Sequence, residues 1–152
     1  MSELQNLKQP ASEEGMAAEL LKTAKTVAVV GISAKEDRDS HKVAKYLKEH
    51  GYKIVPVNPG LKQVLGEPCY PNLKSVPEHI DVVDIFRNTD AIPGIVDEAI
   101  SVRAGSVWMQ LGLKHDEAAQ KAREAGLSVV MDLCMKIEHA HLSDKKTDSF
   151  PG

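Results

Sequence analysis

Thr26-Val-Ala-Val-Val30 is a continuous run of mostly β-branched residues, and Gly31 follows it directly. A run without polar alternation is typical of a strand that is buried on both faces of a parallel sheet. Gly31 has no Cβ atom, so it allows the chain to turn and a ligand to approach the backbone. Residues 40–50 carry an apolar stripe with Gly51 behind it, which predicts a helix. A strand, a loop and a helix thus open the fold.

The alternation of strands and helices continues to residue 131. Further strands are predicted over residues 52–57, 81–86, 106–109 and 127–131, and further helices over residues 90–102 and 115–125. Strands that are separated by single helices form parallel βαβ units with right-handed crossovers. We therefore expect an α/β fold: a Rossmann-like parallel sheet of about five strands with helices on both faces, in a single domain.

The two ends of the chain are expected to differ from this core. Residues 12–25 form an apolar stripe that predicts a helix, so we interpret residues 1–25 as an N-terminal helical extension packed on the domain. Residues 26–142 form the Rossmann-like domain. Residues 143–152 are polar and end in Pro-Gly, which indicates a flexible tail.

Composition excludes several classes of protein. The formal charge of −3 argues against a general nucleic-acid binder, which carries a basic excess. Two cysteines are too few for a disulfide framework or a four-cysteine metal site. No apolar run approaches the roughly 20 residues that span a bilayer, and the N-terminus shows no signal peptide. We expect a cytoplasmic protein without a membrane or nucleic-acid partner.

The loop after the first strand is the first candidate site, because ligands of open parallel sheets bind where the strand order reverses. Ser33 offers a hydroxyl, and Ser40 is a plausible N-cap whose helix presents free N–H groups. Positive charge comes from Lys35, Arg38 and Lys42. Together these groups predict an anion site that is suited to a pyrophosphate.

The loop departs from the dinucleotide fingerprint. That fingerprint requires G-x-G-x-x-G, but here Ser33 stands at the second glycine position. It also requires an acidic residue after the second strand, where this chain has Asn58. No G-x-x-x-x-G-K-[ST] motif is present, which excludes a P-loop NTPase. NAD is thus disfavoured but stays open.

Several segments, in order, resemble the small stand-alone CoA-binding proteins. Their fold is similar to that of the N-terminal CoA-binding domain of the succinyl-CoA synthetase α subunit. The resemblance covers about residues 23–142, and the segments that carry it are Gly31-Ile-Ser33, Asp37-Arg-Asp-Ser-His41, Val55-Pro-Val-Asn-Pro59, Gly66-Glu-Pro-Cys-Tyr-Pro71, Val107-Trp-Met-Gln-Leu-Gly112 and Asp132-Leu-Cys-Met-Lys-Ile-Glu-His139.

This resemblance implies that coenzyme A or an acyl-CoA binds across the strand ends. It assigns the nucleotide phosphates to the loop residues Gly31, Ser33, Ala34, Arg38 and Ser40. Asn58 and Pro59 would line the nucleotide pocket. The pantetheine arm would be flanked by Phe86, Arg87, Gln110, Leu111 and Gly112.

The sequence contains no evident catalytic machinery. Family members usually carry an arginine where this chain has Leu133, so a role for that segment is in doubt. Cys134 is a candidate nucleophile that would need nearby positive charge, with Lys136 close in sequence, although an inert buried cysteine is the commoner case. Asp81 and Asp84 fall on opposite faces of a predicted strand, so they cannot form a carboxylate pair.

Three functions remain open at this point. The first is a CoA or acyl-CoA binding module without chemistry of its own. The second is an enzyme that uses NAD(P) or another nucleotide, and the third is a regulatory protein that senses acyl-CoA. The sequence names no protein partner and leaves a homodimer open.

Overall fold

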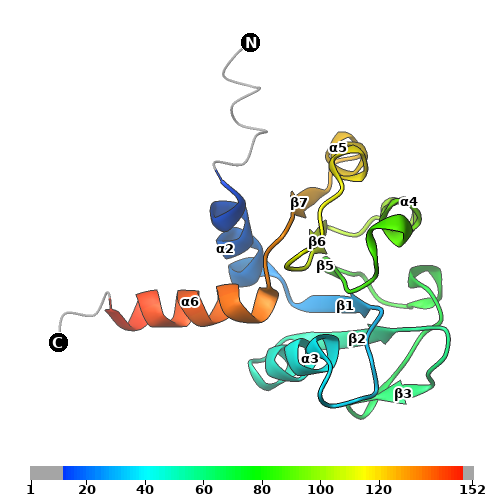
Figure 1. Ribbon diagram of the computed structural model, residues 1–152, viewed down its shortest axis with the longest axis horizontal. Helices are drawn as coiled ribbons and strands as arrows, with labels where there is room; N and C mark the ends of the chain where they lie inside the picture. Colours follow the sequence, from blue (N-terminus) through cyan, green and yellow to red (C-terminus); the bar gives the residue numbers. More distant parts are fainter. Residues whose placement is uncertain (1–11, 149–152) are drawn as a thin grey trace.

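The centre of the molecule is a five-stranded parallel sheet in the order β2-β1-β5-β6-β7 (Figure 1). The computed structural model describes residues 12–148, and the side chains of residues 12–142. The strands are β1 (Thr26–Val30), β2 (Lys53–Val57), β5 (Val82–Ile85), β6 (Ser106–Met109) and β7 (Ser128–Val130). The Rossmann-like α/β fold expected from the sequence is confirmed, with each predicted strand within a few residues of its expected place.

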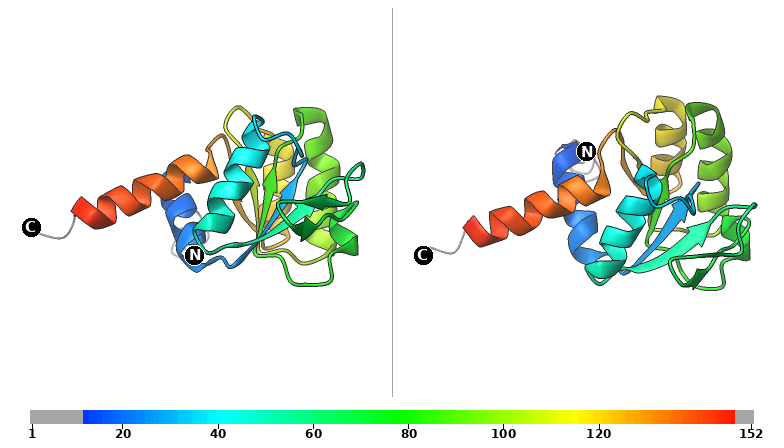
Figure 2. Two further views of the ribbon diagram at one scale, coloured as in Figure 1. Left: turned by 90° about the horizontal axis from the view of Figure 1, so that it is seen from below. Right: turned by 60° about the horizontal axis from the view of Figure 1, so that its bottom comes forward.

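Helices cover both faces of this sheet (Figure 2). One face packs against α4 (Ile92–Ser101) and α5 (Asp116–Glu124). The other packs against α2 (Glu13–Thr23), α3 (Asp39–Glu49) and α6 (Met135–Asp148). Among residues 12–148, no helix combines the length and the apolar character needed to cross a membrane.

Strand β1 occupies an interior position between β2 and β5. Val27 and Val29 face α2, α3 and α6, whereas Ala28 and Val30 face α4 and α5, and all four are buried. Both edges of the strand are hydrogen-bonded, so no backbone group is left to water. The two-faced burial predicted from its continuous apolar run is confirmed.

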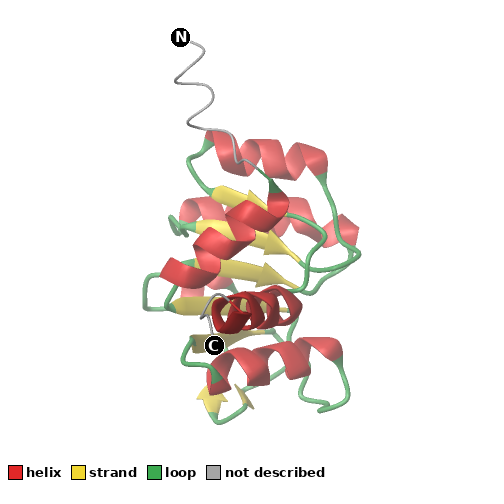
Figure 3. Cartoon of the chain, turned by 90° about the vertical axis from the view of Figure 1, so that its left-hand side faces the viewer, coloured by secondary structure: helices red, strands yellow, loops and turns green. Residues whose placement is uncertain are grey.

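The chain changes direction across the sheet at β1. The first crossover, through α3, places β2 on one side of β1, and the next places β5 on the other side. The strands run in one direction (Figure 3), so their carboxyl ends share one edge of the sheet. The switch point between β1 and β5 therefore opens a crevice at this edge, where such folds bind ligands.

A small antiparallel hairpin lies beside the sheet and was not expected from the sequence. Its strands are β3 (Gln63–Val64) and β4 (Glu67–Pro68), joined by Leu65 and Gly66 with φ values of 55° and 76°. Positive φ at both central residues is the signature of a type I′ hairpin turn. Strands of two residues are too short to show a period, so only Gly66 signalled the turn. Two short 3₁₀ helices, η1 (Leu73–Ser75) and η2 (Thr89–Ala91), complete the elements.

Helix α6 was also not predicted. Residues 143–148, which we expected in a tail, belong to this helix, and residues 149–152 lie outside the described part of the chain. The helix lacks a regular apolar stripe, although Met135 is buried in the core and Leu142 packs against it. Its far end projects from the body of the molecule (Figure 2). Sequence periodicity cannot reveal a helix of this kind.

Candidate functional site

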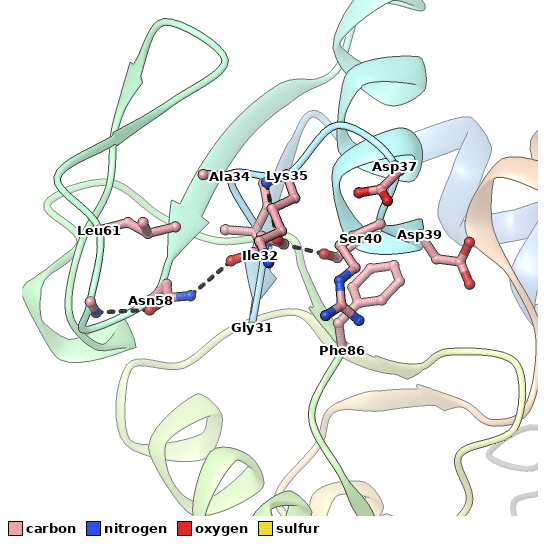
Figure 4. A pocket seen from close by; sticks show the side chains of 13 residues that line it. Gly31, Ile32, Ala34, Lys35, Asp37, Asp39, Ser40, Asn58, Leu61 and Phe86 are labelled. Atoms are coloured by element: carbon pink, nitrogen blue, oxygen red, sulfur yellow. Dashed lines mark hydrogen bonds between the residues drawn. The ribbon is translucent and has the colours of Figure 1, made fainter.

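A cavity of about 760 Å³ lies at the switch point, between the loop after β1 and the ends of β2 and β5 (Figure 4). It is lined by residues of three segments: Gly31, Ile32, Ser33, Ala34, Lys35, Asp37, Arg38, Asp39, Ser40, Asn58, Gly60, Leu61 and Phe86. We call this space the first cavity. The loop that the sequence singled out forms most of its wall.

Gly31 starts the loop in a left-handed conformation, with φ of +88°. Its N–H donates to the carbonyl of Val57 at 2.9 Å, which ties it to β2. A Cβ atom at this position would lie 2.6 Å from the carbonyl oxygen of Phe86. Glycine is thus required here both for conformation and for the close approach of the neighbouring strand.

Ser40 does not cap the following helix, so this prediction was wrong. Helix α3 begins one residue earlier, its N-cap is Arg38, and no side chain caps it. The buried Ser40 hydroxyl instead accepts a hydrogen bond from the N–H of Ser33 at 3.0 Å. Ser33 in turn accepts from the N–H of Lys35 at 3.0 Å, and its carbonyl is bonded to Nδ1 of His41 at 2.9 Å. The two serines thereby hold the shape of the loop.

The N-terminus of α3 opens into the first cavity through Asp39 and Ser40. The first intrahelical bond runs from Lys42 N–H to the Arg38 carbonyl at 3.0 Å, so the N–H groups before it have no partner within the helix. These groups and the positive end of the helix dipole favour an anion. The lining cations Lys35 and Arg38 add to this preference for an anion, whereas the carboxylates of Asp37 and Asp39 oppose it.

Asn58 connects the end of β2 to the loop after β1. Its Nδ2 donates to the carbonyl of Ile32 at 2.8 Å, and its Oδ1 accepts from the N–H of Gly60 at 2.8 Å (Figure 4). Both ends of the amide are therefore used inside the protein. An aspartate here, as in the dinucleotide fingerprint, could accept from Gly60 but could not donate to Ile32. Asn58 lines the cavity as a positioning residue.

A second cavity, of about 550 Å³, continues across the ends of β5 and β6. It shares Phe86 and Asp39 with the first cavity, so the two adjoin. The remaining lining residues come from α3, from the β5 and β6 ends and from the start of α6: Lys42, Val43, Arg87, Asn88, Gln110, Leu111, Leu113, Cys134, Lys136 and Ile137. Gln110 is buried, and its Oε1 accepts from the first N–H of α6, that of Met135, at 3.2 Å.

The structure brings most of the predicted residues to these two spaces. Pro59 and Gly112 are the exceptions, since both are exposed and line neither cavity. Sequence reasoning did not anticipate the contributions of Ile32, Asp39, Leu61, Leu113 and Ile137. Ile137 depends on α6. Ile32, Leu61 and Leu113 are apolar, so nothing in the sequence distinguishes a cavity wall from ordinary packing at these positions, and the Asp39 carboxylate opposes the anion site that the loop predicts.

Cys134 lies half-buried at the start of α6 and lines the second cavity together with Lys136. Both residues thus line one cavity, and the Cys134 thiol forms no hydrogen bond within residues 12–142. Cys69 donates to the carbonyl of Asn58 at 3.6 Å, and burial raises the pKa of its thiol. No group of three or more metal-ligating side chains occurs in the described part of the chain.

An aromatic cluster joins α6 to α3 behind the second cavity. The Tyr46 hydroxyl and Nδ1 of His139 share a hydrogen bond of 2.9 Å. The His50 ring stacks on Tyr46 at 4.0 Å, and the His139 ring meets the rings of Tyr46, His50 and Tyr52 edge-on. Burial, with a smaller contribution from His50, lowers the pKa of His139 below its ordinary value. The cluster therefore favours a neutral His139.

This shift predicts that folding stability falls as the pH drops through about 6.5, the ordinary pKa of histidine. The unfolded chain takes up the proton of His139 first, so acid favours the unfolded state until the folded protein is protonated as well. Urea unfolding between pH 5 and 8 measures the slope of the free energy of unfolding against pH. His139→Gln should flatten it, whereas His141→Gln, an exposed site on the same helix, should leave it in place. Equal slopes in the wild type and in both variants would contradict the assignment of this pH dependence to His139.

Residues 25–140 match the family model of the CoA binding domain. The uncharacterized protein YneT of Bacillus subtilis is 42% identical over 122 residues, which cover 80% of this chain and 90% of YneT. An ADP-forming acetate–CoA ligase of Archaeoglobus fulgidus is 27% identical over 137 residues, which cover 82% of this chain. The match spans only 20% of the length of that ligase.

Solved structures agree with these sequence matches. A hypothetical protein from Pyrococcus horikoshii superposes with a TM-score of 0.82 at 41% identity, and the match covers 89% of this chain and 96% of that protein. A protein from Thermus thermophilus superposes with a TM-score of 0.79 at 36% identity, covering 86% and 98% of the two chains. Both matches extend over almost the whole of the solved chains, so the fold is shared as a complete unit.

Proposed function

The chain belongs to the CoA-binding domain family, and from this premise we propose that it binds coenzyme A or an acyl-CoA across the carboxyl ends of its strands. The nucleotide and its phosphates occupy the first cavity, and the pantetheine arm passes Phe86 into the second. The proposal assigns binding to this chain and no reaction.

One observation carries this proposal. The first cavity lies at the switch point of the sheet and receives the uncapped N-terminus of α3, together with the cations of the loop. Backbone N–H groups and a helix dipole at a topological switch point are the usual means of holding a pyrophosphate. The adjoining second cavity, lined by both apolar and polar side chains, provides room for a long arm beyond the phosphates.

Ligand-dependent melting tests the proposal. CoA should raise the melting temperature more than dephospho-CoA or NAD does, because a ligand that binds only the folded state stabilises it according to its affinity. Equal shifts with the three nucleotides would contradict the preference for CoA. The absence of any shift, together with no heat of binding by calorimetry, would overturn the function itself.

Arg38→Ala examines the phosphate site directly. Arg38 is exposed at the N-cap of α3 and lines the first cavity, so its guanidinium can reach a bound phosphate. Loss of one charge-assisted hydrogen bond should cost about 1.5–3 kcal/mol of binding free energy, or roughly a tenfold to hundredfold rise in Kd. Lys45→Ala, on an exposed position of the same helix that lines neither cavity, is the control. Unchanged CoA affinity in Arg38→Ala would place the phosphates elsewhere.

A further inference from the structure

The second cavity is cationic in a chain that carries a net charge of −3. Lys42, Arg87 and Lys136 line it, and Asp39 is the one carboxylate among its lining residues. None of the three cations forms a salt bridge with another described side chain. Lys136 lies 5.7 Å above the Tyr46 ring, which positions its charge without neutralising it. The cavity therefore carries uncompensated positive charge.

Five large apolar side chains line the same cavity. Val43, Phe86 and Leu113 contribute to its lining, and Leu111 and Ile137 complete it. Leu111 is 62% exposed and Ile137 44% exposed, and these two are the large hydrophobic side chains that the described part of the chain leaves most open to solvent. Exposed apolar side chains at the mouth of a cavity indicate a surface that a ligand covers. Apolar walls combined with unpaired cations suit an aliphatic group that carries an anion.

We propose that the second cavity selects an acyl-CoA whose acyl group carries a free carboxylate, that is, a dicarboxylic acyl thioester. This inference rests on the proposed function, because it places the nucleotide in the first cavity and the arm over Phe86, which lines both spaces. The acyl end then reaches the second cavity. There its methylene carbons contact Leu111 and Ile137, and its carboxylate lies among the three cations.

The same cations could instead hold a phosphate of CoA, if the ligand lay in the opposite direction. The two arrangements differ in one measurable respect. A carboxylate site discriminates between acyl groups, whereas a phosphate site affects every CoA derivative equally. Malonyl-CoA and propionyl-CoA form a matched pair for this purpose, since a carboxylate in one replaces a methyl group in the other.

The test measures the Kd of both thioesters, and of CoA, by calorimetry. The wild-type chain should bind malonyl-CoA about tenfold more tightly than propionyl-CoA, the difference expected from one charge-assisted contact. Lys136→Gln and Lys42→Gln should each reduce this ratio, and Lys45→Gln, on an exposed position outside both cavities, should preserve it.

The other possible results of these binding measurements distinguish a failure of the carboxylate inference from a failure of the proposed function. Equal affinity of the wild-type chain for the two thioesters, with CoA bound tightly, would overturn the carboxylate inference and leave the proposed function intact. A ratio that persists in Lys136→Gln and Lys42→Gln, while all three ligands weaken together, would assign these cations to a phosphate and also overturn it. No measurable binding of any CoA derivative would overturn the proposed function and the inference together.

Discussion

Gly31→Ala should lower the free energy of unfolding by roughly 2–5 kcal/mol. About 1–2 kcal/mol of this arises because Gly31 has φ of +88°, a left-handed conformation that alanine disfavours. A further 1–3 kcal/mol, roughly, comes from overpacking, since the new Cβ atom would lie 2.6 Å from the Phe86 carbonyl oxygen. That oxygen belongs to the backbone, so relief requires the ends of β1 and β5 to separate. The loop that shapes the first cavity would move with them.

Gly51→Ala is the matched control for this prediction. Gly51 has a similar φ of +96°, but an added Cβ atom would meet nothing within 4 Å. Gly51→Ala should therefore lower the free energy of unfolding only through its left-handed backbone conformation, by about 1–2 kcal/mol. Urea unfolding of both variants, with CoA binding measured beside it, gives the comparison. Equal destabilisation by the two substitutions would show that the approach of Phe86 to Gly31 does not constrain the loop.

Asp84→Asn should increase stability at neutral and alkaline pH. Asp84 is fully buried in β5, in register between Val29 and Trp108, and neither carboxylate oxygen has a hydrogen-bond partner among the described residues. An unsatisfied buried polar group costs about 1–3 kcal/mol, and more when it is charged. Asparagine retains the shape of the side chain and removes the charge.

The pH dependence of this effect follows from the pKa of Asp84, which burial raises well above its ordinary value of 3.8. Above pH 3.8 the unfolded chain releases this proton while the folded protein retains it. Stability therefore falls as the pH rises towards the folded-state pKa, by up to about 1.4 kcal/mol for each pH unit. The advantage of Asp84→Asn should grow with pH over this window, as urea unfolding from pH 4 to 9 would reveal.

Asp81→Asn is the control for Asp84→Asn and should change stability in the opposite direction. Asp81 precedes the same strand, and its Oδ2 accepts hydrogen bonds of 2.9 Å from the N–H groups of Lys25 and Thr26. Loss of its charge weakens both bonds, so this variant should be destabilised. An Asp84→Asn advantage that stays constant with pH would show that Asp84 is not protonated in the folded protein.

The sheet was predictable because each of its strands has a local signature. The continuous apolar run at Thr26–Val30 is typical of a strand in the interior of a parallel sheet, and β1 lies there. Helices α3 and α5 end where Gly51 and Gly126 follow them. The hairpin of β3 and β4 was not predictable, because strands of two residues show no period. Helix α6 was not predicted either, since its sequence shows no regular apolar stripe.

Part of the candidate site could be predicted for the same reason. A glycine after a buried strand, followed by hydroxyls and cations, is a local pattern, and these residues line the first cavity. The role of a single side chain within that pattern was harder to predict from the sequence. Ser40 looked like a helix cap, but it bonds to the N–H of Ser33, which lies seven residues earlier in the chain. Only the folded loop brings these groups together.

The sequence by itself determined the class of fold, the switch point after β1 and the loop that forms the wall of the first cavity. These follow from local patterns: which residues can be buried, where the backbone must turn and where charge collects beside a helix N-terminus. The tertiary structure alone decided that α6 completes the second cavity, that Lys42, Arg87 and Lys136 share it, and that Asp84 is buried without a hydrogen-bond partner among the described residues. These properties depend on contacts between residues far apart in the chain, and therefore on packing, which no local pattern records.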